Sequence, residues 1–184
     1  GNLEGKNVVI IGAGTIGLMA LMFVLKQKPN CVVVSDLSDE RLEIARSLGA
    51  KTLNPKKEEG ASVLNEAFGA AQADVTIEAV GITSTVQQSI ALLKNGGTAV
   101  WIGNSAKLVD VPMQEVVTRE LRIQGTNVYT MDEFKEIAKM LETEYLGLDK
   151  LISKICTLEE APEYFDRLAH APGAMIKVLV KVSE

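Results

Sequence analysis

The chain has 184 residues, 47% of them hydrophobic, and a formal net charge of −5 at pH 7. This length is sufficient for one substantial core, and the acidic balance argues against a nucleic-acid partner, since no cluster of Lys and Arg relieves it. The longest uninterrupted apolar run, residues 18–25, is too short to cross a bilayer, so we expect no membrane partner either.

The strongest pattern lies in residues 8–36. An apolar strand at residues 8–11 leads into Gly12-Ala13-Gly14-Thr15-Ile16-Gly17, which opens an apolar helix, and a second apolar strand at residues 31–34 ends at Ser35-Asp36. A glycine-rich turn between a strand and a helix, followed by an acid at the tip of the next strand, is typical of a dinucleotide site.

Each residue of the turn has a mechanical role in such a site. Gly12 permits the tight turn, Gly14 lets a pyrophosphate approach the backbone, and Gly17 lets the helix pack close to the strand. The N–H groups near Thr15 and Ile16 face the pyrophosphate at the positive end of the helix dipole.

Asp36 lies 36 − 17 = 19 residues beyond the last glycine, where a carboxylate can hold both ribose hydroxyls. The alternative, three glycines that merely pack a strand against a helix, leaves Asp36 unexplained. A 2′-phosphate close to Asp36 would meet a like charge, at a cost of about 4 kcal/mol for a separation of about 4 Å and an effective dielectric constant near 20. The pattern therefore predicts NAD rather than NADP, although Arg41 could offset part of the repulsion.

The rest of the chain alternates apolar runs with helical periodicity, which predicts an α/β, doubly wound parallel sheet (a Rossmann fold) with about six parallel strands. The strands are expected at residues 8–11, 31–34, 51–53, 74–78, 98–102 and 121–125. Ser38 is expected to cap a helix, and another helix is expected to begin at Thr83 or Ser84 and to end at residues 95–97.

The region after residue 130 has a different character. Thr130 with Glu133, and Thr157 with Glu160, form two capping boxes, and residues 176–180 form a last strand. We therefore predict two parts, an NAD-binding domain at residues 1–130 and a C-terminal α/β tail at residues 131–184.

Together these features resemble one family, the medium-chain dehydrogenases, near the zinc-type alcohol, polyol and threonine dehydrogenases. The matching residues are Val8–Gly17, Asp36, Arg41-Leu42, Ala45, Leu48-Gly49-Ala50, Asp74–Gly81, Gly96-Gly97-Thr98, Pro112, Arg119-Glu120-Leu121, Gly125, Leu158-Glu159 and Lys177-Val178. They extend over nearly the whole chain, and they do not select a substrate.

The resemblance implies roles for individual residues. Asp36 would take the adenine ribose with Arg41 beside it, and Lys177 would lie near the pyrophosphate. The nicotinamide end would be formed by Ile16 behind the ring, Val80 and Gly81 along the cleft, the backbone of Ile102, and Thr126 and Val128 nearby.

For the full-length enzyme, the resemblance implies hydride transfer between a secondary alcohol, such as a polyol, and NAD. The catalytic zinc would be held by an N-terminal domain that is missing here, since the chain opens at Gly1 with the first strand almost at once. The tail would pack on that domain, and residues 108–113 would join two copies into a homodimer or a higher homo-oligomer.

The chain itself offers no metal-ligand set and no catalytic residues, so alone it is expected to be inactive. His170 is its one histidine and is expected in a surface loop, and Glu78 is expected to serve a structural hydrogen bond. The two cysteines, Cys31 and Cys156, are far apart in the sequence, and two isolated thiols predict a reducing, cytoplasmic location.

Three alternatives remain open. A zinc-free quinone-reductase-like relative would prefer NADP, which Asp36 disfavours. A stand-alone NAD-sensing module would share the glycines and the acid but not Leu48-Gly49-Ala50 or the returning tail. A methyltransferase would place an acid just ahead of the glycines, where this chain has Ile10-Ile11.

Overall fold

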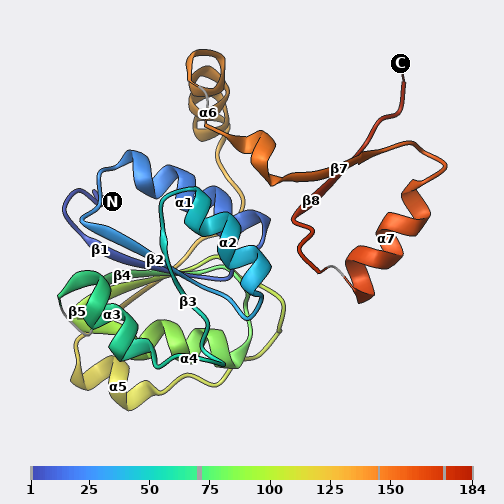
Figure 1. Ribbon diagram of the computed structural model, residues 1–184. Helices are drawn as coiled ribbons and strands as arrows, with labels where there is room; N and C mark the ends of the chain where they lie inside the picture. Colours follow the sequence, from blue (N-terminus) through green and yellow to red (C-terminus); the bar gives the residue numbers. More distant parts are fainter. Residues whose placement is uncertain (1, 70–71, 145, 172, 184) are drawn as a thin grey trace. The chain divides into compact units, whose positions relative to one another are not determined.

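The computed structural model describes residues 2–69, 72–144, 146–171 and 173–183 (Figure 1). The chain divides into two compact units, residues 1–126 and 127–184. The boundary that we predicted between residues 130 and 131 lies slightly later in the chain. Each unit is described separately below.

The first unit is built on one parallel sheet. Its strands are β1 (Asn7–Ile11), β2 (Cys31–Ser35), β3 (Lys51–Leu53), β4 (Ala73–Glu78), β5 (Leu93–Trp101) and β6 (Arg122–Gly125). They lie in the order β3-β2-β1-β4-β5-β6, and every neighbouring pair is parallel. This is the strand order of a Rossmann fold, so the predicted fold class is confirmed.

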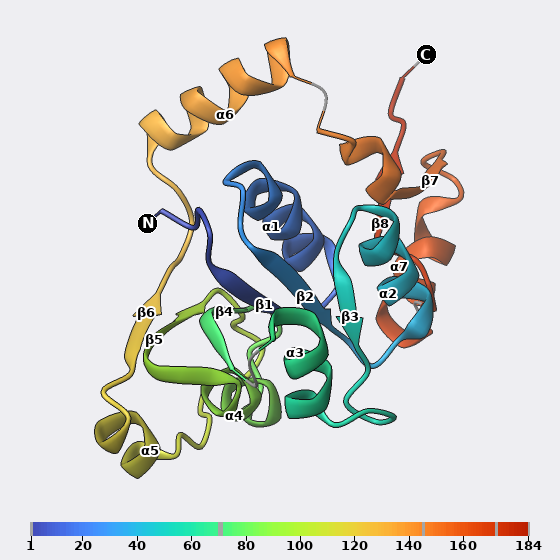
Figure 2. The same ribbon diagram turned by 60° about the vertical axis from the view of Figure 1, so that its left-hand side comes forward.

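Helices cover both faces of this sheet. They are α1 (Thr15–Lys26), α2 (Asp39–Ser47), α3 (Gly60–Phe68), α4 (Thr83–Ala91) and the short α5 (Met113–Thr118). The first two, α1 and α2, lie on one face, and α3 and α4 lie on the other (Figure 1). The view in Figure 2 shows α1 alongside β1 and β2, the two strands that it connects. The order of strands reverses between β1 and β4, which is where doubly wound sheets bind their ligands.

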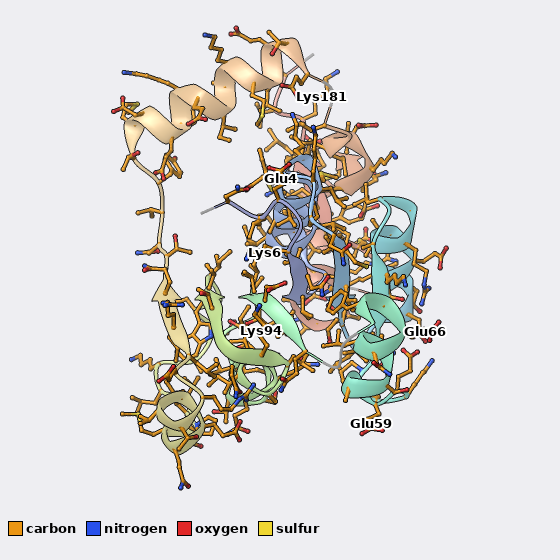
Figure 3. All side chains as sticks on the ribbon, turned by 90° about the vertical axis from the view of Figure 1, so that its left-hand side faces the viewer. Glu4, Lys6, Glu59, Glu66, Lys94 and Lys181 are labelled. Carbon is orange, nitrogen blue, oxygen red and sulfur yellow. The ribbon has the colours of Figure 1, made fainter. Side chains whose placement is uncertain are left out.

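The core follows from the composition of the strands. Residues 8–11 are all buried, as expected of a β-branched run in a parallel sheet that is covered on both faces. On one face Val9 and Ile11 pack with Leu64 of α3. Charged side chains such as Glu59, Glu66 and Lys94 lie at the exposed periphery (Figure 3). The buried sheet is therefore a rigid support for the loops at its carboxyl edge.

The predicted start of the fifth strand was wrong. We expected residues 95–97 to end a helix and the strand to cover residues 98–102, but α4 ends at Ala91 and β5 begins at Leu93. Ala73 pairs with Leu93 and Val75 with Thr98, so residues between these pairs bulge out of the ladder. Gly96 has a φ of +71°, a conformation that glycine adopts without strain, and this allows the bulge.

The second unit contains α6 (Met131–Thr143), the 3₁₀ turn η1 (Leu148–Leu151), β7 (Ile152–Cys156), α7 (Ala161–His170) and β8 (Lys177–Val180). The two strands pair in parallel, and β7 was not predicted. The first capping box is confirmed, with Thr130 and Glu133 bonded in both directions. Thr157 and Glu160 are also bonded in both directions, but they do not cap the helix as predicted, because α7 begins at Ala161 and its N-cap is Glu160 itself. In the described parts of the chain, no helix is long and apolar enough to span a membrane.

Candidate functional site

The turn between β1 and α1 gives each of its three glycines a different environment. Gly12 has a φ of +99°, and a Cβ there would lie 2.7 Å from Cγ2 of Val80. A Cβ at Gly17 would lie 1.8 Å from the carbonyl oxygen of Gly12, so no side chain fits. A Cβ at Gly14 would meet no atom within 4 Å. The turn is therefore closed on the side of the protein and open at Gly14.

The N-terminus of α1 suits an anion. Gly14 is its N-cap and makes no side-chain capping bond, and the first turn contains no acidic residue. The first bond within the helix runs from the N–H of Leu18 to the carbonyl of Gly14 at 2.9 Å. Thr15 and Ile16 are the first helical residues, and Ile16 is 51% exposed although its neighbour Gly17 is buried. The open face of the turn thus combines accessible backbone with the positive end of the helix dipole.

Asp36 lies directly after β2, and its carboxylate reaches the glycine turn. The N–H of Ala13 donates to Asp36 Oδ2 at 2.7 Å, and the N–H of Ser38 donates to Oδ1 at 2.9 Å. The N–H of Asp36 donates in turn to the carbonyl of Leu53, at the end of β3, at 3.2 Å. Each carboxylate oxygen has more than one lone pair, so both remain able to accept a bond from a hydroxyl.

Arg41 lies in the first turn of α2. Its N–H donates to Oγ of Ser38 at 3.3 Å, which confirms Ser38 as the helix cap. Arg41 is half-buried, and its Nε is buried without a hydrogen-bond partner among the described residues. A buried guanidinium donor without an acceptor is unfavourable, and an anionic or hydroxyl-bearing ligand nearby could satisfy it.

The carboxyl ends of β4 and β5 are joined by Glu78, which is fully buried. Its Oε1 accepts from the N–H groups of Val80 at 2.9 Å and Gly81 at 2.7 Å. Its backbone carbonyl accepts from Ile102 at 2.8 Å and Gly103 at 3.1 Å. Glu78 therefore has the structural hydrogen-bonding role that we predicted for it.

Gly103 is a site residue that the sequence analysis missed. A Cβ there would lie 2.1 Å from the N atom of Gly81, and a Cβ at Gly81, whose φ is +84°, would lie 2.3 Å from the N atom of Asn104. The two backbone turns after β4 and β5 therefore cross in contact, and only glycines allow it. The sequence contained a signal for this residue, because Gly103 is a glycine that directly follows the predicted strand at residues 98–102.

The structure brings most of the predicted residues together at the carboxyl edge of the sheet. The turn at residues 12–17, Asp36 and Val80 lie close together, because the ends of β1, β2 and β4 are neighbours in the sheet. Gly81 and Ile102 are held beside them by Glu78. Thr126 follows β6, where its N–H donates to the carbonyl of Trp101 at 3.0 Å. Val128 belongs to the second unit and is 83% exposed, so its role stays a prediction.

Among the described residues there is no group of three or more His, Cys, Asp or Glu side chains that could hold a metal ion. His170, which we expected in a loop, is instead the last residue of α7, where its exposed ring lies 3.1 Å from a carboxylate oxygen of Asp166. A histidine in the last turn is compatible with a helix because its charged form interacts favourably with the dipole. Cys31 and Cys156 are both free, as predicted.

The strand order and the open glycine turn define a dinucleotide-binding type of α/β domain. Residues 15–143 match the family described as zinc-binding dehydrogenases, so the chain belongs to that family and the predicted resemblance is confirmed. The chain is 33% identical over 181 residues to sorbitol dehydrogenase of Mus musculus, covering 96% of this chain and 50% of that protein.

Two solved structures extend the comparison. The alcohol dehydrogenase TADH from Thermus sp. ATN1 is 25% identical and superposes with a TM-score of 0.89, over 98% of this chain and 52% of its own. A protein of Sinorhizobium meliloti 1021, assigned as a zinc-binding dehydrogenase and solved with NADP bound, is 29% identical with a TM-score of 0.83, over 99% of this chain and 54% of its own. The chain spans about half the length of the relatives that it matches.

Proposed function

We propose that the chain binds NAD at the glycine turn and is the cofactor-binding part of a zinc-dependent alcohol or polyol dehydrogenase. The observation that carries this proposal is the position of Asp36, whose carboxylate is bonded to the turn through Ala13 at 2.7 Å. In such an enzyme, NAD exchanges a hydride with a secondary alcohol at its nicotinamide ring.

The residues of the first unit fit the cofactor. The free space at Gly14 leaves room for the pyrophosphate against the backbone, and the start of α1, with glycine as its N-cap, supplies a favourable dipole. Asp36 would accept the adenosine ribose hydroxyls, with Arg41 beside it. Ile16 would contact the nicotinamide, since it is an apolar side chain that the fold leaves half exposed beside the turn.

Within the first unit, the nicotinamide end would be lined by Val80, Gly81, Ile102 and Thr126. Glu78 supports this part of the site, because its side chain and its carbonyl hold both backbone turns. The zinc that polarises the alcohol would be held outside this chain. The similarity to sorbitol dehydrogenase favours a polyol among the secondary alcohols.

NAD is favoured over NADP by charge. The fixed carboxylate of Asp36 would repel a 2′-phosphate, and its two bonds to backbone N–H groups hold it in place. The Sinorhizobium meliloti protein was solved with NADP bound, so the titration below compares both cofactors. NADPH-selective binding would support the quinone-reductase-like alternative instead.

We further propose that the enzyme is a cytoplasmic homodimer or a higher homo-oligomer. Leu108 is 91% exposed and Met113 68% exposed, so the segment predicted to join two copies presents apolar side chains to solvent. An apolar surface of this kind is typical of an interface. The two free cysteines are consistent with a reducing compartment.

The test is a parallel titration of the purified chain with NADH and NADPH. Trp101 is its one tryptophan and lies next to Ile102, so energy transfer from it to the nicotinamide gives a built-in signal of binding. We expect NADH to bind at least about tenfold more tightly than NADPH, a difference of about 1.4 kcal/mol.

Two variants make the test specific. Asp36→Asn removes the charge but keeps one carbonyl oxygen, and should weaken NADH binding and narrow the preference over NADPH. Glu43→Gln makes the same charge change at an exposed position of α2, where Glu43 pairs with Arg46, and should leave both affinities unchanged. Equal affinities for NADH and NADPH in the unchanged chain would contradict the proposed selectivity, and no binding of either would contradict an autonomous NAD site.

A further inference from the structure

Asn54 is a buried polar residue that the proposed cofactor site does not explain. It directly follows β3 and is only 3% exposed, although asparagine is usually found at the surface. Buried polar side chains are retained where all their bonds are satisfied, so its partners indicate what it does.

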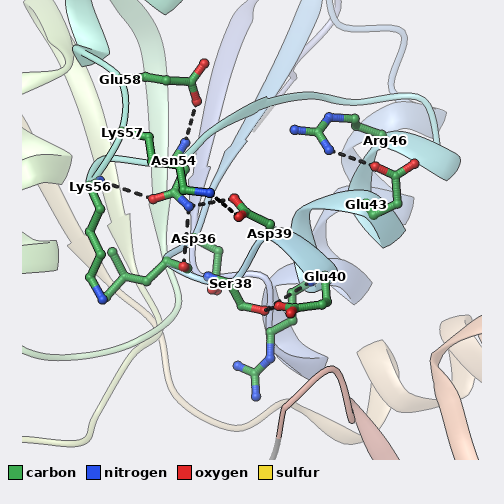
Figure 4. A network of polar contacts seen from close by, with 12 residues as sticks. Asp36, Ser38, Asp39, Glu40, Glu43, Arg46, Asn54, Lys56, Lys57 and Glu58 are labelled. Carbon is green, nitrogen blue, oxygen red and sulfur yellow. Dashed lines mark hydrogen bonds and ion pairs between the residues drawn. The ribbon is translucent and has the colours of Figure 1, made fainter.

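The side chain of Asn54 links two loops (Figure 4). Its Nδ2 donates to Oδ1 of Asp39 at 2.7 Å and to the carbonyl of Leu37 at 3.4 Å. Its Oδ1 accepts from the N–H of Lys56 at 3.1 Å, and its own N–H donates to Oε2 of Glu58 at 2.9 Å. Both ends of the amide are therefore used.

These bonds fix the segment that holds Asp36. Leu37 and Asp39 flank Ser38, and the N–H of Ser38 donates to Oδ1 of Asp36. The backbone of Asp36 is bonded to Leu53, the residue before Asn54. The end of β3 thus supports Asp36 twice, directly through the backbone and indirectly through the amide of Asn54.

We propose that Asn54 is a positioning residue for the cofactor: without touching it, Asn54 holds the loop at residues 37–39 so that the Asp36 carboxylate is oriented before NAD arrives. This proposal rests on the proposed function. A carboxylate that is already oriented loses less conformational freedom on binding, and this raises affinity. The effect should therefore appear only with ligands that use Asp36.

The first test is Asn54→Ala, measured by NADH titration. We expect the dissociation constant for NADH to rise about tenfold, the upper end of the cost of ordering one side chain on binding, because the Asp36 carboxylate would no longer be oriented in advance. Reduced nicotinamide mononucleotide lacks the adenosine that Asp36 would hold, so its affinity should not change. Asn30→Ala is the matched control, because Asn30 is exposed and its amide bonds to Asn7 at the opposite edge of the sheet.

A double-mutant cycle separates positioning from a general structural role. In the Asp36→Asn background, Asn54→Ala should leave the NADH dissociation constant unchanged within about twofold, because the group on which it acts is already altered. An equal weakening in both backgrounds, or no weakening in either, would overturn the positioning role.

Asp39→Ala provides an independent variant should Asn54→Ala fail to fold. Asp39 is exposed, and replacing it removes the oxygen that accepts the bond from Asn54 Nδ2 at 2.7 Å. Like Asn54→Ala, it should weaken NADH binding only in chains that retain Asp36. Lys57→Met is its control, since Lys57 forms an ion pair with Asp39 but has no bond to Asn54 through its side chain. NADH binding that is unchanged in Asp39→Ala would overturn the role of this loop. Wild-type chain that binds no NADH would instead contradict the proposed function itself.

Discussion

The position that a Cβ of residue 17 would occupy lies 1.8 Å from the carbonyl oxygen of Gly12. The obstacle is backbone, and Gly12 is itself held by its N–H, which donates to the carbonyl of Ser35 at 2.7 Å. Neither side can move without disturbing β1, β2 and α1 together. The glycine at position 17 is therefore required by packing, whether or not a cofactor is bound.

We predict that Gly17→Ala destabilises the chain by about 3 kcal/mol, the upper end of the range for overpacking, because the clash is with backbone and not with a flexible side chain. Urea unfolding followed by Trp101 fluorescence measures the loss. An unfolding midpoint equal to that of the wild type would show that the turn can widen at little cost, contrary to this expectation.

Gly14→Ala should have the opposite effect, since it should change the stability of the fold little but weaken the binding of NADH. A Cβ at position 14 meets nothing within 4 Å, and an alanine N-cap typically costs about 1 kcal/mol or less relative to glycine, so the fold should tolerate it. The added methyl group would stand where the pyrophosphate is expected to approach. We predict a rise of about tenfold to a hundredfold in the NADH dissociation constant, from the cost of overpacking at the ligand. Unchanged NADH affinity would place the pyrophosphate elsewhere.

Glu78 provides a third prediction, which concerns stability. Glu78→Ala leaves the N–H groups of Val80 and Gly81 without their acceptor, and we expect a loss of about 3 kcal/mol in the free energy of unfolding. Glu78→Gln keeps an oxygen that can accept both bonds, so it should recover more than half of that loss. Urea unfolding of the three proteins decides the question, and equal losses in the two variants would show that the charge, not the hydrogen bonds, matters.

The sequence was sufficient to predict the parts of the site that depend on local pattern. The glycine turn, Asp36 at the tip of β2 and the cap at Ser38 each follow from a short motif with a mechanical reason. The parallel sheet also follows from the alternation of apolar runs and helices, since parallel strands need crossover connections that are usually helical, whereas the order of the strands was known only from the structure.

Other features depend on contacts between distant residues, and no local pattern encodes them. Gly103 is required because it crosses Gly81, which lies on a different turn, and Asn54 is buried because it bonds to Leu37 and Asp39. The start of β5 was misplaced because the bulge at residues 95–97 looks like the end of a helix when only its glycines are considered. Tertiary pairing decided these cases over local propensity.

The fourth prediction concerns the stability of the fold at acidic pH. Asp74 lies in β4 at the amino-terminal edge of the sheet, where its side chain pairs with Lys94 and accepts the N–H of Asn7 at 2.8 Å. Burial, the largest single influence, raises the pKa of Asp74, but the bonds from Lys94 and Asn7 together outweigh it and leave the pKa below its ordinary value of 3.8. The folded state therefore binds this proton less readily than the unfolded chain does. It follows that the carboxylate stabilises the fold fully above the unfolded-state pKa, and that this contribution is lost as the pH falls through the folded-state pKa.

We expect Asp74→Asn to be less stable than the wild type by about 1 to 2 kcal/mol at pH 7, because the amide keeps the bond to Asn7 but not the charge that faces Lys94. The difference should shrink from about pH 4 downward as Asp74 of the wild type becomes protonated. Urea unfolding of both proteins between about pH 3 and pH 7 measures it. The pKa of Asp39 is also lowered, chiefly by its hydrogen bond to Lys57, but this carboxylate is common to both proteins and cancels in the comparison. A difference that stays constant over the whole range would mean that Asp74 acts through its shape and not through its charge.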